Sequence, residues 1–256
     1  MKKLEGKVAL VTGSSQGIGQ GIVERFAQEG AKVIINYRDL DDPPKQTESQ
    51  VTAAGGEFLS VQADVTKAAQ VDAMVKQAVE RFGHIDILVN NAGVEKHAQF
   101  VDVTEQDYDL VMNVNLKGAF FATQAVVRTM IDKEIAGRII NISSVHEDLP
   151  FPNFTAYCIS KGGMKMMMRN LAIELAPHCI TVNNIAPGAI ETPINSKLLN
   201  DPPKLKALLC NIPLARLGQP RDVAGAAVFL ASEDAAYVTC ATLFVDGGLT
   251  WDYSEQ

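Results

Sequence analysis

The sequence has few cysteines, few aromatic residues and no evident long apolar run. Its four cysteines lie far apart, at positions 158, 179, 210 and 240, so no close pair has the spacing of a zinc or redox motif. The apolar stretch near the N-terminus is too short for a signal peptide, and we expect no later stretch to reach the roughly 20 apolar residues of a membrane span. These absences predict reduced thiols and a cytoplasmic protein.

Positive charge is also in short supply, because 23 lysine and arginine residues face 30 aspartate and glutamate residues. The formal net charge of −7 argues against nucleic acid and membranes as partners, since neither attracts an acidic surface. The four histidines, at positions 84, 97, 146 and 178, lack the spacing of metal ligands, so no metal site is expected.

What the chain does contain is a regular alternation of short β-branched runs with longer amphipathic segments, such as 17–30, 66–83 and 155–177. Such alternation indicates βαβ units, which build a parallel sheet with helices on both faces. We predict an α/β protein with a doubly wound, Rossmann-type sheet of about seven strands, in a single domain over 1–256. The predicted strands lie within 7–13, 31–37, 56–64, 85–93, 137–144, 180–188 and 241–248.

The first predicted strand runs into a glycine-rich turn and then a helix, in the sequence VALVTGSSQGIGQGIVERF. This context distinguishes a dinucleotide site from a chance glycine match. Gly13 permits a tight turn, Gly17 lets a cofactor approach the backbone, and Gly19 allows the helix to pack closely on the sheet. The unpaired N–H groups at the start of the helix would bind the pyrophosphate.

Six motifs follow one another in a fixed order along the whole chain. They are TGSSQGIG (12–19), NNAG (90–93), NVNLKG (113–118), INISS (140–144), YCISK (157–161) and PGAIETP (187–193). Together they resemble the compact, single-domain branch of the short-chain dehydrogenase/reductase superfamily. Within it, the stretches INYR, SSVHE and SKGGMK are most similar to bacterial glucose 1-dehydrogenases.

The resemblance implies a catalytic group of Asn115, Ser144, Tyr157 and Lys161. A tyrosine hydroxyl has an ordinary pKa near 10, too high for an efficient base near neutrality, and a cation such as Lys161 one turn away is expected to lower it. Ser144, at the end of a predicted strand, would hold the substrate oxygen against Tyr157, while Ser143 faces elsewhere. Asn115 would help to hold a water for proton relay.

The choice of cofactor depends on the end of the second predicted strand, where Tyr37 and Arg38 take the place of an acidic residue. Arg38 can pair with a 2′-phosphate, so NADP is favoured over NAD, although Asp39 follows closely. The full cofactor site implied by the resemblance consists of Gly13, Ser15, Gln16, Gly17, Ile18, Gly19, Tyr37, Arg38, Asp64, Val65, Asn91, Ala92, Gly93, Tyr157, Lys161, Pro187, Gly188, Ile190 and Thr192.

Polar residues after the sheet-edge motifs are the candidates for binding substrate. Glu95 and His146 each follow such a motif, and Asn195 lies in the stretch 189–212, which we interpret as a lid over the substrate. Ser144 would also contact the substrate. An extensively apolar helix with methionines at positions 164, 166, 167 and 168 fits burial against another subunit, and the resemblance suggests a homotetramer.

These observations lead to one principal hypothesis and two alternatives. The principal hypothesis is a hydride transfer between NADP(H) or NAD(H) and a small alcohol or carbonyl substrate, with oxidation of an aldose such as glucose at C1. A carbonyl or 3-oxoacyl reductase of the same superfamily is the alternative enzyme. A non-catalytic, nucleotide-sensing protein is the alternative outside enzymes, although the full catalytic group argues against it.

Overall fold

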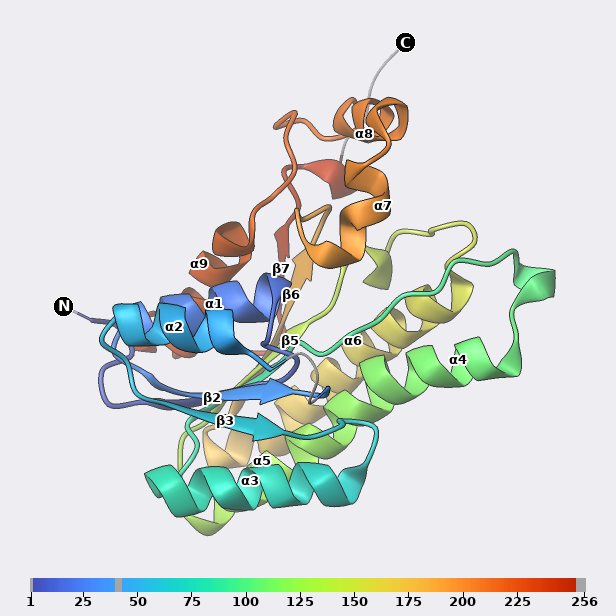
Figure 1. Cartoon of the computed structure of the whole chain (residues 1–256). Coiled ribbons are helices and arrows are strands. Elements are labelled where there is room, and N and C mark those ends of the chain that lie inside the picture. The colour runs from blue at the N-terminus through green and yellow to red at the C-terminus, as the bar shows by residue number, and fades with distance from the viewer. Residues whose placement is uncertain (1, 40–42, 252–256) are drawn as a thin grey trace.

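The computed structural model describes residues 2–39 and 43–251, and its centre is one sheet of seven strands (Figure 1). All six strand pairs are parallel, in the order β3-β2-β1-β4-β5-β6-β7, which confirms the predicted doubly wound sheet with the seventh strand at one edge. The strands are β1 (Val8–Val11), β2 (Lys32–Tyr37), β3 (Phe58–Gln62), β4 (Ile87–Asn90), β5 (Arg138–Ile142), β6 (Thr181–Pro187) and β7 (Thr242–Val245).

Helices cover both faces of the sheet and bury two separate apolar cores. One core joins the sheet to α1, α2 and α9, with Phe26 and Ile35 at its centre, and the other joins it to α3, α5 and α6, around Leu88 and Met130. All four residues of β1 are buried, as expected for a central strand with helices on both sides. The helices are α1 (Gly17–Gln28), α2 (Lys45–Ala53), α3 (Ala68–Phe82), α4 (Glu105–Met112), α5 (Ala119–Asp132), α6 (Thr155–Leu175), α7 (Ser196–Leu199), α8 (Pro202–Leu209) and α9 (Pro220–Ala231).

Glycine or proline follows the ends of three helices. Gly30 and Gly83, after α1 and α3, have φ angles of 91° and 86°, a left-handed conformation that glycine adopts without strain. Helix α6 ends at Leu175, and Pro177 lies in the short 3₁₀ turn that follows it. The amphipathic segments 17–30, 66–83 and 155–177 therefore match α1, α3 and α6 to within two residues at each end.

Helices α4 and α5 are joined by a π-helical stretch, Asn113–Gly118, into one continuous helix. Over Glu105–Asp132 this helix is long and apolar enough to cross a membrane by length and composition alone, contrary to the expectation from the sequence. However, 56% of its most apolar window is buried inside the protein, where α5 packs on the sheet. Its apolar character is that of a core helix.

The carboxyl ends of the strands meet at one edge of the sheet, where ligands of doubly wound folds bind. Above this edge stand α7 and α8, which lie within the predicted lid 189–212 (Figure 1). Within residues 2–39 and 43–251, no group of three His, Cys, Asp or Glu side chains is placed to hold a metal ion.

Candidate active site

The glycine-rich turn between β1 and α1 is shaped by close backbone contacts. Gly13 and Gly17 have φ angles of 58° and 62°, and a Cβ atom on Gly13 would lie 2.8 Å from Cα of Ala92. A Cβ on Gly19 would lie 2.7 Å from the carbonyl oxygen of Gly13. Gly13 therefore makes the tight turn and Gly19 the close approach that the sequence predicted.

The start of α1 is suited to an anion. Gln16, at the N-cap, makes no side-chain cap, and the first turn carries no acidic residue. Its backbone N–H groups and the positive end of the helix dipole are therefore available to a phosphate group. Across the turn, the methyl group of Thr192 would lie 3.5 Å from a Cβ on Gly17. This cradle, with backbone N–H groups at its base, fits a dinucleotide.

Buried polar side chains below the turn hold its shape, and two of them, Thr12 and Asn36, were not among the predicted site residues. Asn36 Oδ1 accepts from Gly13 N at 3.0 Å, and Thr12 Oγ1 accepts from the N–H groups of Asn91 and Ala92. Asn91 Nδ2 donates in return to the carbonyl oxygens of Thr12 and Gly13. Asn36 lies one residue before Tyr37, the position that bears on cofactor choice. A polar residue inside the otherwise apolar run VIINY was the signal that could have identified it.

At the end of β2, Arg38 is already paired. Its Nε and Nη2 donate to the two carboxylate oxygens of Asp39 at 2.9 and 2.7 Å, and both side chains are exposed. The pairing raises the pKa of Arg38 and lowers that of Asp39, in each case chiefly through these hydrogen bonds. A 2′-phosphate would have to compete with Asp39 for the guanidinium group.

The remaining predicted cofactor residues lie at the ends of β3 and β6. Asp64 Oδ1 accepts from Thr66 N at 2.9 Å, and the neighbouring Val65 is buried against Gly118. Pro187 ends β6, and a Cβ on the following Gly188 would lie 2.9 Å from Cα of Asp246. Ile190 packs its side chain into the core, so a contact with a carboxamide would use its backbone.

The two serines after β5 point to different partners. Ser143 Oγ donates to the carbonyl oxygen of Ile185 at 3.0 Å, which fixes it towards β6 as expected. Ser144 Oγ accepts from His146 N at 3.2 Å. A hydrogen bond from the Ser144 hydroxyl also lowers the pKa of the Tyr157 phenol. Ser144 is therefore the serine that shares a site with Tyr157.

Tyr157 and Lys161 lie on one face of α6, beside the end of β5. The ammonium nitrogen of Lys161 lies 5.5 Å from the centre of the Tyr157 ring and donates to the carbonyl oxygen of Ile142 at 2.8 Å. Lys161 is only 4% exposed, which is unusual for a lysine and places its charge inside the site. A Cβ on Gly93 would lie 3.8 Å from the same nitrogen.

Burial dominates the ionisation of this pair. It raises the pKa of Tyr157 to about 12, against a hydrogen-bond contribution from Ser144 that lowers it. It lowers the pKa of Lys161 to about 8, and the carboxylate of Glu147 raises that value. The expected lowering of the Tyr157 pKa is therefore wrong for the protein alone, because the loss of water around the phenol, together with the carboxylate of Glu95, outweighs the hydrogen bond from Ser144.

Asn115 lies in the π-helical stretch and is completely buried. Its Oδ1 accepts from Val94 N at 2.8 Å, and its Nδ2 donates to the Val94 carbonyl oxygen and to Ser160 Oγ. Such single π-turns inside helices often occur at functional sites. The side chain thus joins the segment after β4 to α6, a positioning role beyond the predicted water relay, which stays a prediction.

Of the four candidate substrate residues, Glu95 and His146 join Ser144 beside Tyr157. The carboxylate of Glu95 raises the pKa of Tyr157, and its own pKa is raised by burial. The His146 ring centre lies 6.3 Å from that of Tyr157, and burial lowers its pKa. Asn195 instead donates to the carbonyl oxygen of Ile190 at 2.7 Å, so the structure uses its amide within the lid.

An aromatic stack next to this group was not predicted. Phe151 lies parallel to His146 at 4.3 Å and to Phe154 at 4.1 Å, and His97 meets Phe154 edge-on at 5.2 Å. Phe151 is 37% exposed, so the stack keeps an apolar edge open. The spacing of these residues in FPNF gave no helical or strand period that would have marked them.

Comparison with known proteins agrees with this geometry. Residues 13–250 match the family model described as enoyl-(acyl carrier protein) reductase. The chain is 44% identical to 3beta-hydroxysteroid dehydrogenase 1 of Eggerthella lenta, over 96% of this chain and 95% of that protein. It is 42% identical to glucose 1-dehydrogenase 2 of Bacillus subtilis, over 97% and 96%.

Among solved structures, a gluconate 5-dehydrogenase from Burkholderia cenocepacia, in complex with NADP and tartrate, superimposes with a TM-score of 0.93. It is 37% identical in sequence, and the match covers 98% of each chain. The glycine cradle, the Ser144–Tyr157–Lys161 group and these relatives lead to one assignment. The chain belongs to the short-chain dehydrogenase/reductase superfamily and is an oxidoreductase that acts on alcohol or carbonyl substrates.

Proposed function

We propose that the protein transfers a hydride between NADP(H) or NAD(H) and a cyclic alcohol or its carbonyl product, with oxidation of an aldose such as glucose at C1 as the first candidate. The observation that carries the proposal is the gathering of Ser144, Tyr157 and Lys161 at the sheet edge, beside a glycine cradle. Glu95 and His146 add polar groups beside Tyr157 that suit a substrate with several hydroxyls.

The proposed mechanism assigns one task to each side chain. Bound nicotinamide supplies the acceptor or donor of the hydride and, when oxidised, a positive charge. Ser144 holds the substrate oxygen, and Tyr157 takes or gives the proton at that oxygen. Lys161 supplies positive charge next to the phenol, which opposes the effect of burial on the Tyr157 pKa. We also propose that Asn115 helps to hold a water for proton relay.

The cradle residues would hold the nucleotide, with the phosphates on the N-terminus of α1. Arg38 supports NADP as the preferred cofactor, and its pairing with Asp39 leaves NAD as an accepted one. The B. cenocepacia relative carries NADP, in agreement with this preference.

A second candidate substrate is a 3β-hydroxysteroid. The exposed edge of Phe151 and the stacked Phe154 form an apolar wall that His146 joins to Tyr157, and a flat, rigid, apolar ring system would bury its face against such a wall. The relative from E. lenta is named for this activity. A carbonyl or 3-oxoacyl reductase is the third reading.

The test is a panel of glucose, other aldoses, a 3β-hydroxysteroid and small secondary alcohols and ketones, each with NADP and NAD in both directions, followed by nicotinamide absorbance. We expect NADP⁺-linked oxidation of glucose. Turnover of the steroid without turnover of glucose would replace the first candidate by the second. No turnover of any member would contradict the proposed hydride transfer and favour the nucleotide-sensing alternative.

A variant separates the two ring substrates. Phe151→Ala removes the exposed edge of the wall and should raise KM for a steroid about tenfold, while KM for glucose changes less, because a sugar covers less apolar surface. Tyr237→Ala, which truncates a fully exposed aromatic side chain, is the matched control and should change neither KM. Equal changes for both substrates would contradict the wall as a selective surface.

We further propose a cytoplasmic homotetramer. On α5 and α6, Phe120 is 45% exposed, Met166 57% and Ile173 74%, while Met164 and Met168 are buried in the chain itself. Exposed apolar side chains on two adjacent helices are suited to a contact between subunits. Light scattering coupled to size exclusion would test this, and a mass near the 27.6 kDa of one chain would contradict it.

A further inference from the structure

A row of polar side chains crosses the sheet on the face covered by α5 and α6. Asn90, Asn141, Asn184 and Thr242 occupy paired positions on β4, β5, β6 and β7. Asn90 Nδ2 donates to Asn141 Oδ1, and Asn141 Nδ2 donates to Asn184 Oδ1, both at 2.9 Å. The amides therefore all donate in the same direction, from β4 towards β6.

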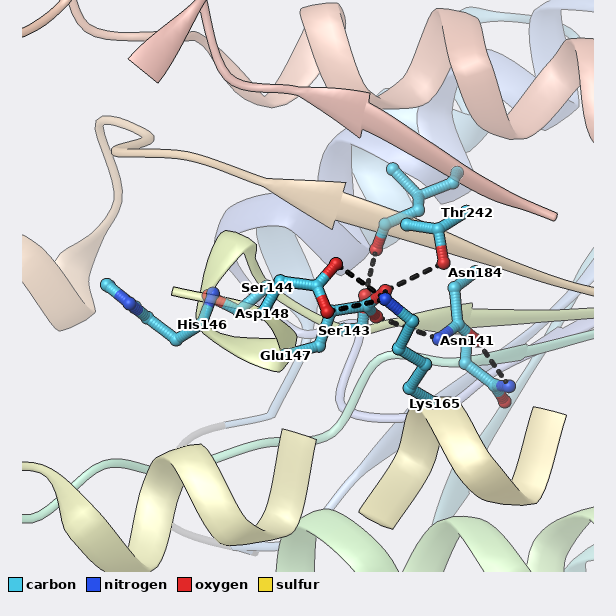
Figure 2. A network of polar contacts seen from close by, with 10 residues as sticks. Asn141, Ser143, Ser144, His146, Glu147, Asp148, Lys165, Asn184 and Thr242 are labelled. Carbon is cyan, nitrogen blue, oxygen red and sulfur yellow. Dashed lines mark hydrogen bonds and ion pairs between the residues drawn. The ribbon is translucent and has the colours of Figure 1, made fainter. Parts of the chain in front are cut away.

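The row ends on the carboxylate of Glu147, whose side chain is completely buried (Figure 2). Asn184 Nδ2 donates to one of its oxygens at 2.9 Å, and Thr242 Oγ1 donates to the other at 2.7 Å. Lys165 Nζ lies 3.4 Å from that second oxygen. A buried carboxylate is stable only with such partners, because its desolvation costs several kcal/mol.

The position of Glu147 connects this row to the active site. It closes the 3₁₀ turn Val145–Glu147, which begins directly after Ser144, and Ser144 caps that turn by accepting from His146 N. Figure 2 shows Glu147 directed towards Lys165 and Thr242, while His146 points away from the network. The carboxylate of Glu147 thus anchors the segment that carries Ser144 and His146, through partners on β6, β7 and α6.

Lys165 connects the same segment to the catalytic helix. It lies on α6, one turn after Lys161, and its Nζ donates to both carboxylate oxygens of Asp148 at 2.6 and 2.5 Å. Its side chain is 16% exposed. The ion pairs with Asp148 and Glu147 therefore hold the segment after Ser144 against the helix that carries Tyr157 and Lys161.

We propose that Glu147 and Lys165 are positioning residues of the active site: they fix the Ser144 segment against α6, and their opposite charges act in opposite directions on Lys161, which precedes Lys165 by one turn of the same helix. The proposal rests on the proposed function only in assigning Ser144 and Lys161 a role in turnover.

The electrostatic part agrees with the ionisation of Lys161. Burial lowers the pKa of Lys161, and Glu147 acts in the opposite direction. Other charged or titratable groups at the site are Tyr157, Cys158 and Lys165 on α6, and His146 and Asp148 in and after the turn. Glu95 acts on Tyr157 from the segment after β4. Loss of Glu147 would lower the pKa of Lys161 further, and loss of Lys165 would raise it.

Two substitutions test these opposite effects. In Glu147→Gln both hydrogen bonds can be kept, since the amide oxygen can accept from Asn184 and the amide nitrogen can donate to the hydroxyl of Thr242, which reverses its role. Lys165→Met keeps the length of the side chain and removes its charge. Thr242→Val is the third variant, because it removes a hydrogen bond and keeps both charges.

The measurement is the pH dependence of trace labelling of Lys161 by acetic anhydride, read by peptide mass spectrometry on the full-length protein without nucleotide or substrate. We expect the midpoint to fall by about one pH unit in Glu147→Gln and to rise by up to about one unit in Lys165→Met. Thr242→Val should leave it in place. Glu80→Gln and Lys76→Met, in an exposed ion pair on α3, are the matched controls and should also leave it unchanged.

Midpoints equal to wild type in folded Glu147→Gln and Lys165→Met proteins, or shifts of both in the same direction, would overturn the proposal. If Glu147→Gln does not fold, the rise in Lys165→Met decides the matter. The labelling needs no turnover, so its failure is separate from failure of the oxidoreductase assays. Where turnover is found, the pH profile of kcat should shift in the same direction as the labelling midpoint of each variant.

Discussion

The two halves of the sheet build their parts of the site in different ways. Around β1 and β2 the site is a shape made by backbone, with Gly13 and Gly17 in left-handed conformations and an anion cradle that carries no side chains. Around β5 and β6 the site is made by buried side chains, with Lys161 and Glu147 almost removed from water. The first half fits its ligand through the space left between backbone atoms, and the second half acts on its ligand through buried charges.

This difference decides which changes each half tolerates. A left-handed turn packed against Ala92 has no room for a methyl group. The buried charges around α6 have room for isosteric replacements, but each one shifts the pKa of the others. Substitutions in the backbone half should therefore change nucleotide affinity, and substitutions around α6 should change turnover.

The largest effect is expected from Tyr157→Phe in the charged half. Loss of the phenolic proton should lower kcat by about 100- to 10,000-fold, the usual contribution of a general acid–base group. The affinity for the nucleotide, measured by calorimetry, should stay within about twofold, because the ring and Lys161 remain. Activity close to wild type would show that another group moves the proton.

A smaller effect, of the opposite kind, is expected from Gly13→Ala in the backbone half. The new Cβ would lie 2.8 Å from Cα of Ala92 in a left-handed residue, so the turn must shift. We expect nucleotide affinity to fall about 10- to 100-fold and protein stability to fall by about 1–3 kcal/mol. Calorimetry with NADP and NAD would measure the first effect, and urea unfolding the second.

Gly55→Ala is the matched control for this turn. Gly55 has a φ angle of 72°, but a Cβ there would have no atom within 4 Å. It should therefore lose about 1 kcal/mol of stability through backbone strain alone and leave nucleotide affinity unchanged. Equal affinities in both variants would show that crowding at Gly13 does not shape the nucleotide site.

The smallest effect is expected at the exposed pair after β2, where charge acts within the backbone half. Arg38→Ala should weaken NADP several-fold and NAD hardly at all, since an exposed ionic contact contributes little. Asp39→Asn should strengthen NADP by a similar factor, because it frees the guanidinium group. Equal losses of both nucleotides in Arg38→Ala would count against a phosphate contact.

The backbone half was readable from the sequence. The positions of Gly13 and Gly19 predicted the turn and the close packing, and the amphipathic segments 17–30 and 66–83 run up to the left-handed Gly30 and Gly83, because the conformational freedom of glycine acts locally. All seven strands lie within the predicted ranges, since a parallel sheet covered on both faces needs continuous apolar runs.

The charged half was readable only in part. The motifs indicated Ser144, Tyr157 and Lys161, but the partners of Glu147 stand 18, 37 and 95 residues away, so only the strand register reveals them. The predicted lowering of the Tyr157 pKa was wrong because the burial of the phenol depends on every element packed around α6. The aromatic stack was missed because its members lie in two loops without a regular period, 146–154 before α6 and the segment after β4 that carries His97.

The asparagine row has a consequence for how the chain folds. If β6 moved by two residues along β5, Asn184 would lie opposite Ile139 and Asn141 opposite Ala186, both on an apolar face. Each buried amide left without a partner would cost about 1–3 kcal/mol. Apolar strands alone would tolerate such a misalignment, since isoleucine and valine pack similarly in either position. The three amides therefore make the correct alignment of β4, β5 and β6 the one that a folding chain can keep.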